Sequence, residues 1–161
     1  MGRHGMNLRT ATIDDLDVLL GLAVAFYQED GFSTPRAALG AHLRVLVGDD
    51  RARVAVGLDE AGRVVAFGIT TTTFGLENGL IAELEDLYVD PSSRRRGLAR
   101  ALIEDSAAWA ASIGAAQLEL VVAPNGQDVG HLFRYYTARG FQDEGRRLLS
   151  RPLTPPGSPS S

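Results

Sequence analysis

Apolar residues recur along this chain with two kinds of spacing, one typical of helices and one typical of strands. Residues 13–30 carry apolar side chains at helical intervals after Thr12, a residue type that caps helices well. Residues 35–48 repeat this pattern with Pro35 in the first turn. We therefore expect two successive helices near the amino terminus, preceded by a short strand over residues 7–12.

The middle of the chain has the composition of strands. Residues 53–74 form two runs rich in Val, Ile, Phe and Thr around a turn that contains Asp59 and Gly62, which predicts a hairpin. A polar loop over residues 75–79 separates them from residues 80–90, "LIAELEDLYVD", which we interpret as a long strand. The pattern predicts three consecutive strands here.

The last third of the chain alternates between the two spacings. Residues 98–113 predict a helix that Gly114 ends, and residues 117–123 predict a strand. Residues 128–140 have helical spacing again, and residues 141–153 suggest two short closing strands. The element order is strand, two helices, three strands, helix, strand, helix and final strands, which indicates an α/β (α+β) fold.

The length and composition favour a single domain. A chain of 161 residues that is 45% apolar can bury one core but leaves little room for a second. We assign residues 7–153 to that domain and expect residues 1–6 to be a flexible start or a cloning remnant. Residues 154–161 are rich in Pro and Ser, and we expect a disordered tail there.

The overall charge narrows the classes of function. A formal net charge of -4 disfavours a general nucleic-acid-binding surface, and the absence of cysteine excludes disulfides and thiolate nucleophiles. Neither a signal peptide nor a run of membrane-spanning length is visible, so we expect a cytoplasmic protein without a membrane partner. The three histidines lack the spacing of metal ligands, and we expect no metal site.

A local basic cluster stands out against this acidic background. The segment "RRRGLA", residues 94–99, joins the predicted strand over residues 80–90 to the helix that follows. Backbone amides at such a joint, together with the positive end of the helix dipole, can hold a diphosphate. The alternative is a solvated arginine loop without a ligand. The spacing required for a P-loop or a dinucleotide fingerprint is absent, which disfavours ATP and NAD.

With these segments in view, the sequence resembles the GNAT superfamily of N-acetyltransferases, in particular its small-amine acetyltransferases. Arg94, Gly97 and Ala99 fill the family's acetyl-CoA motif, Gln/Arg-x-x-Gly-x-Gly/Ala, in order. "LEDLYVDP" resembles the family's fourth strand, "QLELVV" its fifth, and "LFRYYTARGF" its late helix. The resemblance implies a mixed, mostly antiparallel central sheet that is splayed between strands 4 and 5 and flanked by about four helices.

The resemblance also implies where acetyl-CoA binds. The backbone of the fourth strand would pair with the pantetheine arm, and the amides of the arginine segment would hold the pyrophosphate. The cofactor-binding residues expected on this basis are Leu87, Tyr88, Val89, Arg94, Arg95, Arg96, Gly97, Leu98, Ala99, Arg100 and Asn125. Many relatives carry Asn where this chain has Val129, so Asn125 either reaches the cofactor or forms a turn with Gly126.

Two proton transfers accompany the attack of an amine on a thioester: a base takes a proton from the amine, and an acid gives one to the departing thiolate. The family's Tyr-x-x-x-Gly-Phe spacing selects Tyr136 as the acid that protonates the departing thiolate. For the base we favour Glu85, acting directly or through water, with Glu83 as the reserve. Strand alternation predicts Glu83 and Glu85 on one face and Asp86 on the other. The alternative is that these carboxylates only solvate the strand.

The acceptor is predicted to be a cationic amine, since acidic residues gather in the regions that line the acceptor cleft in relatives. The expected substrate-binding residues are Glu29, Asp30, Glu77 and Asp86. Polyamines and aminoglycosides both satisfy this pattern, and so do a protein lysine and a free amino terminus. A sensor that binds acyl-CoA without transfer is the non-enzymatic alternative, and a homodimer is possible.

Overall fold

The computed structural model describes residues 7–123 and 129–157, which belong to two compact units. The first unit spans residues 1–127 and the second residues 128–161, and each is described by itself. Asn125 and both extreme ends of the chain lie outside the described residues. Every strand that the structure describes belongs to the first unit, whereas the predicted acid Tyr136 and the segment 141–153 belong to the second.

The first unit contains a five-stranded sheet in which the strands follow chain order. The strands are β1 (Asn7–Thr10), β2 (Arg53–Leu58), β3 (Val64–Gly75), β4 (Gly79–Val89) and β5 (Leu118–Glu119). Neighbours pair antiparallel except β4 and β5, which pair in parallel. The helices are α1 (Leu16–Asp30), α2 (Arg36–Val47) and α3 (Leu98–Ser112), with short 3-10 turns η1 (Ile13–Asp15) and η2 (Pro91–Ser93).

The 3-10 turn η1, which leads directly into α1, is capped by the residue that the sequence suggested. Thr12 forms a capping box in which its side chain accepts from Asp14 and its backbone amide donates to Asp15 at 2.8 Å. Arg9 holds both carboxylate oxygens of Asp15 at 2.8 and 2.9 Å. The Arg9 guanidinium lowers the pKa of the buried Asp15 to about 2. This stabilisation is therefore present above the ordinary aspartate pKa and is lost as the pH falls toward 2.

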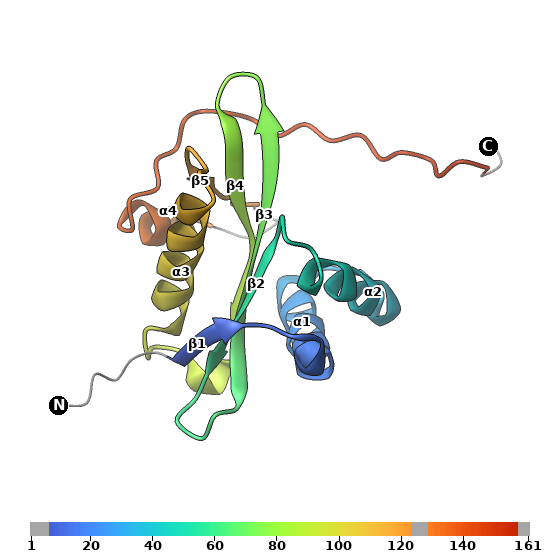
Figure 1. Ribbon diagram of the computed structural model, residues 1–161, viewed down its shortest axis with the longest axis vertical. Helices are drawn as coiled ribbons and strands as arrows, with labels where there is room; N and C mark the ends of the chain where they lie inside the picture. The colour runs from blue at the N-terminus through green and yellow to red at the C-terminus, as the bar shows by residue number, and fades with distance from the viewer. Residues whose placement is uncertain (1–6, 124–128, 158–161) are drawn as a thin grey trace. The chain divides into compact units, whose positions relative to one another are not determined.

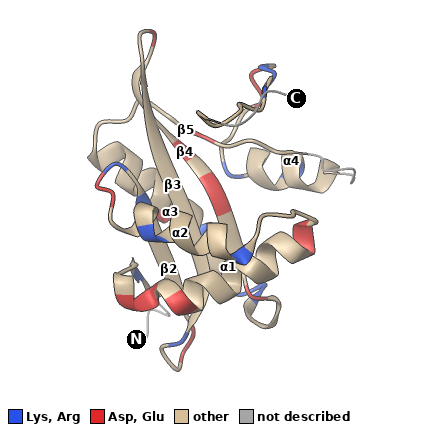
Figure 2. Ribbon diagram, turned by 90° about the vertical axis from the view of Figure 1, so that its right-hand side faces the viewer, with Lys and Arg blue, Asp and Glu red and all other residues tan. Residues whose placement is uncertain are grey.

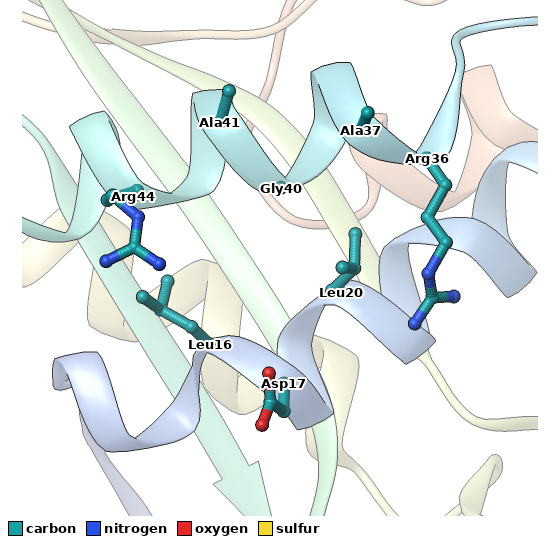
Figure 3. Close-up of a pocket in the computed structure, with 8 residues that line it drawn as sticks. All are labelled: Leu16, Asp17, Leu20, Arg36, Ala37, Gly40, Ala41 and Arg44. Atoms are coloured by element: carbon teal, nitrogen blue, oxygen red, sulfur yellow. The ribbon is translucent and has the colours of Figure 1, made fainter.

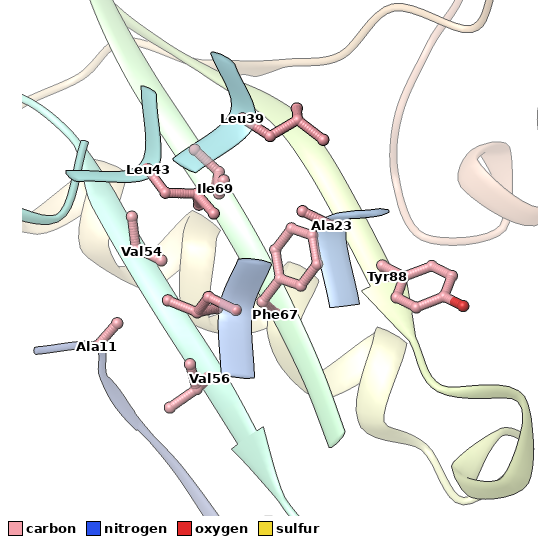
Figure 4. Packing of buried hydrophobic residues seen from close by; sticks show 10 residues of the cluster. Ala11, Ala23, Leu39, Leu43, Val54, Val56, Phe67, Ile69 and Tyr88 are labelled. Carbon is pink, nitrogen blue, oxygen red and sulfur yellow. The ribbon is translucent and has the colours of Figure 1, made fainter. Parts of the chain in front are cut away.

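The helices cover the two faces of the sheet, with α1 and α2 on one and α3 on the other (Figure 1). The first face buries a large apolar cluster around Phe67, which is shown in Figure 4. The second face is lined by small residues, so α3 lies close to the sheet. A Cβ on Gly57 would lie only 3.2 Å from Leu98 Cδ2, which explains why glycine occupies that position.

The strand β5 is shorter than the sequence predicted. Residues 117–123 were expected to form a strand, but only Leu118 and Glu119 pair, opposite Ala82 and Glu83 of β4. A β-bulge then displaces β4 at Glu85, since Thr70 lies opposite Leu84 while Ile69 lies opposite Asp86. The two strands do not pair beyond Glu83, and no strand among the described residues covers this edge of β4 along residues 84–89.

The second unit contains the helix α4 (Gly130–Thr137), which ends in a Schellman motif. Phe141 N donates to Tyr136 O at 3.2 Å, Gly140 N donates to Thr137 O at 3.1 Å, and Gly140 has a left-handed φ of 91°. The prediction of closing strands was wrong for the described part of this unit, because residues 141–153 form no strand. Gly145, with φ 74°, donates to Asp143 and makes a turn in the middle of that segment.

Candidate active site

Three carboxylates of β4 lie on the sheet face that α1 and α2 cover, and we call them the acidic face: Glu83, Glu85 and Asp86. Glu83 pairs with Thr71 and Asp86 with Ile69, two β3 residues that share that face. Figure 2 shows acidic residues as a red band on β4. The expectation that Asp86 faces the opposite side was wrong, because the bulge at Glu85 shifts the alternation by one residue.

Asp86 is bound by a residue that sequence reasoning missed. Tyr27 of α1 donates from its hydroxyl to Asp86 Oδ1 at 3.3 Å. Burial, with Asp86 as the nearest negative charge, raises the pKa of Tyr27 to about 12, so the phenol stays a donor at physiological pH. Burial also raises the pKa of Asp86, while the Tyr27 hydrogen bond opposes that rise. The pair places one aromatic hydroxyl and one carboxylate at the same point of this sheet face.

Glu83 and Glu85 form a second group beside that pair. Glu85 is exposed and accepts from Thr71 Oγ1 at 3.0 Å. Burial raises the pKa of Glu83, and the like charges of Glu85 and Glu119 raise it further. A carboxylate with a raised pKa is a better proton acceptor than an ordinary one. Glu83 also belongs to the last paired position before β4 and β5 part.

The open edge of β4 leads directly to the segment that we call the arginine loop, residues 94–100. Residues 87–89 lie on β4 beyond its pairing with β5. The side chains of Tyr88 and Val89 are buried, and Val89 O accepts from Arg94 Nε, so the remaining backbone groups are the part available to a ligand. An extended chain can bind there by adding hydrogen bonds in the manner of a strand.

The arginine loop has the geometry of an anion nest. Arg95 and Gly97 both have left-handed φ values, 66° and 83°. Among the described residues, no acceptor is bonded to the backbone amides of residues 95–100, and α3 has no side-chain cap. Leu98 is buried and Ala99 is half-buried, so these two residues offer only their amides. The loop can therefore present consecutive donors to a diphosphate at the positive end of α3.

The arginine side chains of the loop divide into two groups. Arg95, Arg96 and Arg100 are exposed and make no ion pair or side-chain hydrogen bond with the described residues. Arg94, in contrast, donates from Nε to Val89 O at 2.9 Å and from a terminal nitrogen to Glu29 at 2.9 Å. The free guanidinium groups are therefore those of the later arginines.

The predicted acceptor residues are not all brought together. Asp86 lies in the acidic face, whereas Glu29 at the end of α1 binds Arg94 and Tyr88. Burial raises the pKa of the neighbouring Asp30, and the Glu29 charge adds to that rise. Glu77 is exposed in the turn between β3 and β4, away from these contacts. The sequence does contain a feature that points to Tyr27. Tyr27, Gly31 and Phe32 repeat the Tyr-x-x-x-Gly-Phe spacing.

Tyr136 lies near the end of α4, and its surroundings within the second unit are aromatic and basic. Its ring is 5.8 Å from that of Phe141 and 5.2 Å from that of Tyr135, both in edge-on geometry. Burial raises the pKa of Tyr136, and the nearby Arg139 opposes that rise. Arg139 stacks on Tyr135, with 3.5 Å between its guanidinium carbon and the ring centroid. A protonated phenol of this kind can donate a proton.

Two grooves lie along the helices of the first unit. The larger, about 530 Å³, runs between α1 and α2, and none of the predicted site residues lines it (Figure 3). The smaller, about 260 Å³, is lined by Tyr27, Phe32 and the hydroxyl residues Ser33 and Thr34, among others. Tyr27 therefore faces both this groove and the acidic face, which places the groove beside the candidate site.

The described residues contain neither a membrane-spanning helix nor a cluster of metal ligands. None of the described helices is long and apolar enough to cross a bilayer. Among the same residues, no group of three or more His, Cys, Asp or Glu side chains could hold a metal ion.

Comparisons with known proteins agree with this geometry. The model of the acetyltransferase (GNAT) family matches residues 17–141. A search of curated proteins by sequence gave no match. Among solved structures, an integron cassette protein, HFX_CASS3, from the mobile metagenome of Cole Harbour Salt Marsh is 30% identical with a TM-score of 0.79. The alignment covers 92% of this chain and 91% of that one.

More distant structures share the fold. Aminoglycoside N-acetyltransferase AAC(6')-Iy, solved in complex with CoA, is 20% identical with a TM-score of 0.78 over 96% of this chain and 100% of that one. A possible acetyltransferase from Clostridium difficile 630 is 19% identical with a TM-score of 0.78, over 92% and 98% of the two chains. The predicted fold class, a mixed sheet with four helices of the GNAT type, is confirmed.

Proposed function

The chain belongs to the GNAT family and is an acetyl-CoA-dependent N-acetyltransferase, and we propose that its acceptor is a primary amine of a small cationic molecule. The observation that carries this proposal is the acidic face. Three carboxylates, Glu83, Glu85 and Asp86, share one side of β4 where the strand parts from β5. A polyamine or an aminoglycoside has the multiple positive charges that such a face attracts.

The chain's own residues fit the cofactor. The amides of residues 95–100 are free to hold a diphosphate, and the open edge of β4 at residues 87–89 can pair with the pantetheine arm. Arg95, Arg96 and Arg100 would add positive charge in an otherwise acidic protein. When bound, acetyl-CoA supplies the thioester carbonyl that the amine attacks.

We assign the proton acceptor to Glu83 and Glu85 acting as a pair. Burial and the neighbouring Glu85 carboxylate raise the pKa of Glu83, which strengthens it as a proton acceptor. Glu85 is the exposed member and would take the proton from the incoming ammonium group, directly or through water. Asp86, held by Tyr27, would bind a positive charge of the same substrate.

Tyr136 is proposed as the proton donor to the departing thiolate of coenzyme A. Its raised pKa keeps the phenol protonated at physiological pH, which is the state that the role requires. We propose direct transfer in a ternary complex, and the absence of cysteine excludes a thiolate that would carry the acetyl group. The homodimer, the cytoplasmic location, the cofactor role of Asn125 and the single domain over residues 7–153 remain predictions of the sequence.

The experiment that tests the proposal is thiol release from acetyl-CoA with a panel of acceptors. The panel contains polyamines, aminoglycosides, amino acids, and peptides with a free lysine or amino terminus. We expect turnover with polyamines or aminoglycosides and a raised KM for the amine in Asp86→Asn. Turnover confined to the peptides would establish a protein acetyltransferase instead, and tight coenzyme A binding without any turnover would favour the sensor.

A further inference from the structure

Glu29, at the last turn of α1, lies at the centre of a contact network that crosses to the arginine loop. Its carboxylate accepts from a terminal nitrogen of Arg94 at 2.9 Å and from the buried Tyr88 hydroxyl at 3.2 Å. The Arg94 guanidinium lies over the Tyr88 ring, 5.4 Å from its centroid. The sequence had placed Glu29 with the acceptor and Arg94 with the cofactor, whereas the two side chains bind each other.

We infer that Arg94 and Glu29 are positioning residues that fasten the arginine loop to α1 and thereby set the affinity for coenzyme A. We call this contact the Arg94–Glu29 bracket. It assigns Glu29 to the cofactor side of the reaction instead of the acceptor side. Arg94 holds the backbone that follows it in position. The amides of residues 95–100 and the side chains of Arg95, Arg96 and Arg100 contact the phosphates.

The hydrogen bonds of Arg94 explain why it serves as a bracket. Its Nε donates to Val89 O, the last residue of β4, and its terminal nitrogen reaches Glu29, so one planar group joins a strand end to a helix end. A phosphate ligand would have to compete with these partners. Arg95, Arg96 and Arg100, which have no such partners among the described residues, meet an anion without that competition.

The backbone next to Arg94 explains why a bracket is needed. Arg95 has a φ of 66°, the one non-glycine residue in the described chain with a left-handed backbone. Such a conformation costs about 1–2 kcal/mol for a residue with a Cβ, and it persists only where neighbouring contacts hold it. The turn before it is fixed by Ser93 N donating to Asp90 O at 2.8 Å. Arg94 holds the other side, so its release would let Arg95 relax and turn the amides away.

This inference rests on the proposed placement of the diphosphate. It can be tested with Glu29→Gln, because the bracket and long-range electrostatics predict opposite changes in the Kd for coenzyme A. Glu29→Gln removes a negative charge near a polyanionic ligand, so long-range electrostatics alone would tighten binding of coenzyme A. The bracket predicts the opposite, a Kd that rises about three- to fivefold, the range for a half-exposed ion pair. Asp50→Asn is the matched control, since Asp50 is an exposed carboxylate in the turn after α2.

The measurement is calorimetric titration of the full chain with coenzyme A, with thermal unfolding of each variant alongside. Arg94→Gln should weaken binding at least as much as Glu29→Gln, because it also removes a positive charge and the hydrogen bond to Val89 O. The double variant should be no weaker than Arg94→Gln, because the contact with Glu29 is already lost there. Glu29→Asp, which keeps the charge on a shorter side chain, should recover part of the affinity. The amine KM should stay within about twofold in Glu29→Gln.

Two outcomes would overturn the inference. If Glu29→Gln binds coenzyme A as Asp50→Asn does and instead raises the amine KM, then Glu29 contacts the acceptor. Gly97→Val, with Gly97→Ala as the milder variant, separates this failure from failure of the diphosphate site itself. Weaker binding in the Gly97 variants with no change in Glu29→Gln overturns the bracket alone. Unchanged affinity in both sets overturns the diphosphate placement as well.

Discussion

Two helix ends in this protein carry the same six-residue pattern, "YQEDGF" at the end of α1 and "YTARGF" at the end of α4. Both close in a Schellman motif. Phe32 N donates to Tyr27 O at 2.8 Å, and Phe141 N donates to Tyr136 O at 3.2 Å. In each the phenylalanine ring contacts the tyrosine ring, at centroid distances of 5.0 and 5.8 Å. The spacing is therefore the signature of a helix end.

The chemistry of the two tyrosines differs because their neighbours differ. Tyr27 donates to Asp86 beside further carboxylates, and its pKa is raised to about 12. Tyr136 lies near Arg139, whose positive charge opposes the rise that burial causes in its pKa. The first phenol is thus suited to hold a carboxylate in place, and the second to give up a proton. A tyrosine's role follows from the charges around it, and the spacing alone does not decide it.

The largest expected effect is a fall in kcat when Tyr136, the proposed proton donor of the two tyrosines, is replaced. Tyr136→Phe should lower kcat about 100-fold, or about 2.7 kcal/mol, since it removes the proposed proton donor, and should leave the coenzyme A affinity unchanged. Tyr135→Phe is the matched control on the same helix and should keep kcat within about twofold. Steady-state kinetics checks both variants, and a Tyr136→Phe enzyme with full activity across pH would exclude the assigned role.

The next effect tests the feature that the two helix ends share. Gly31→Ala and Gly140→Ala should each destabilise their helix end by about 1–2 kcal/mol, because the two glycines have φ values of 77° and 91°. Gly21→Ala, inside α1 with open space around it, should instead stabilise by about 0.5–1 kcal/mol. Denaturant unfolding measures all three. A stabilising Gly31→Ala would contradict the capping role.

A smaller effect is expected from Tyr27→Phe. Loss of the Tyr27 hydroxyl removes the hydrogen bond that lowers the pKa of Asp86, so that pKa should rise further. Because the ionised carboxylate is the form that binds a cation, the amine KM should rise about three- to fivefold as the pH falls and recover as the pH rises. Unchanged dependence of KM on pH would show that Asp86 does not bind the acceptor.

The smallest expected effect concerns Arg139. Arg139→Gln removes the positive charge that opposes the rise in the pKa of Tyr136, so the phenol should titrate at higher pH. The alkaline limb of the kcat profile should move in the same direction. Ultraviolet titration of the phenols measures the shift, with Tyr136→Phe as the reference whose curve is subtracted to isolate Tyr136. A shift toward lower pH would contradict the assigned charge effect.

The hydrophobic pattern was enough to predict most of the fold. Every predicted helix is present, and the sheet strands follow in the expected order, because amphipathic spacing and capping residues act locally. The shortened β5 and the unpaired residues 141–153 depend on partners elsewhere, which local patterns do not report. The bulge had a visible signal, since two adjacent acids, Glu85 and Asp86, interrupt the alternation of β4.

The candidate site was predictable in part. The open edge of β4 and the anion nest lie where the sequence pointed, since both follow from one contiguous segment. The partners of the acidic face and of Arg94 were not foreseen, because Tyr27 lies 59 positions from Asp86 and Glu29 lies 65 positions from Arg94. Only the packing of α1 on the sheet brings these pairs together.

One measurement tests most directly whether the acidic face selects a cationic acceptor. It is the ratio of kcat/KM for 1,4-diaminobutane to that for 4-amino-1-butanol, which replaces the second ammonium group with a neutral hydroxyl. We expect the diamine to be preferred about tenfold or more in the parent enzyme, and the preference to fall in Asp86→Asn. Equal rates for the two amines, or a preference that survives loss of the Asp86 charge, would contradict the assignment of the acidic face to the acceptor.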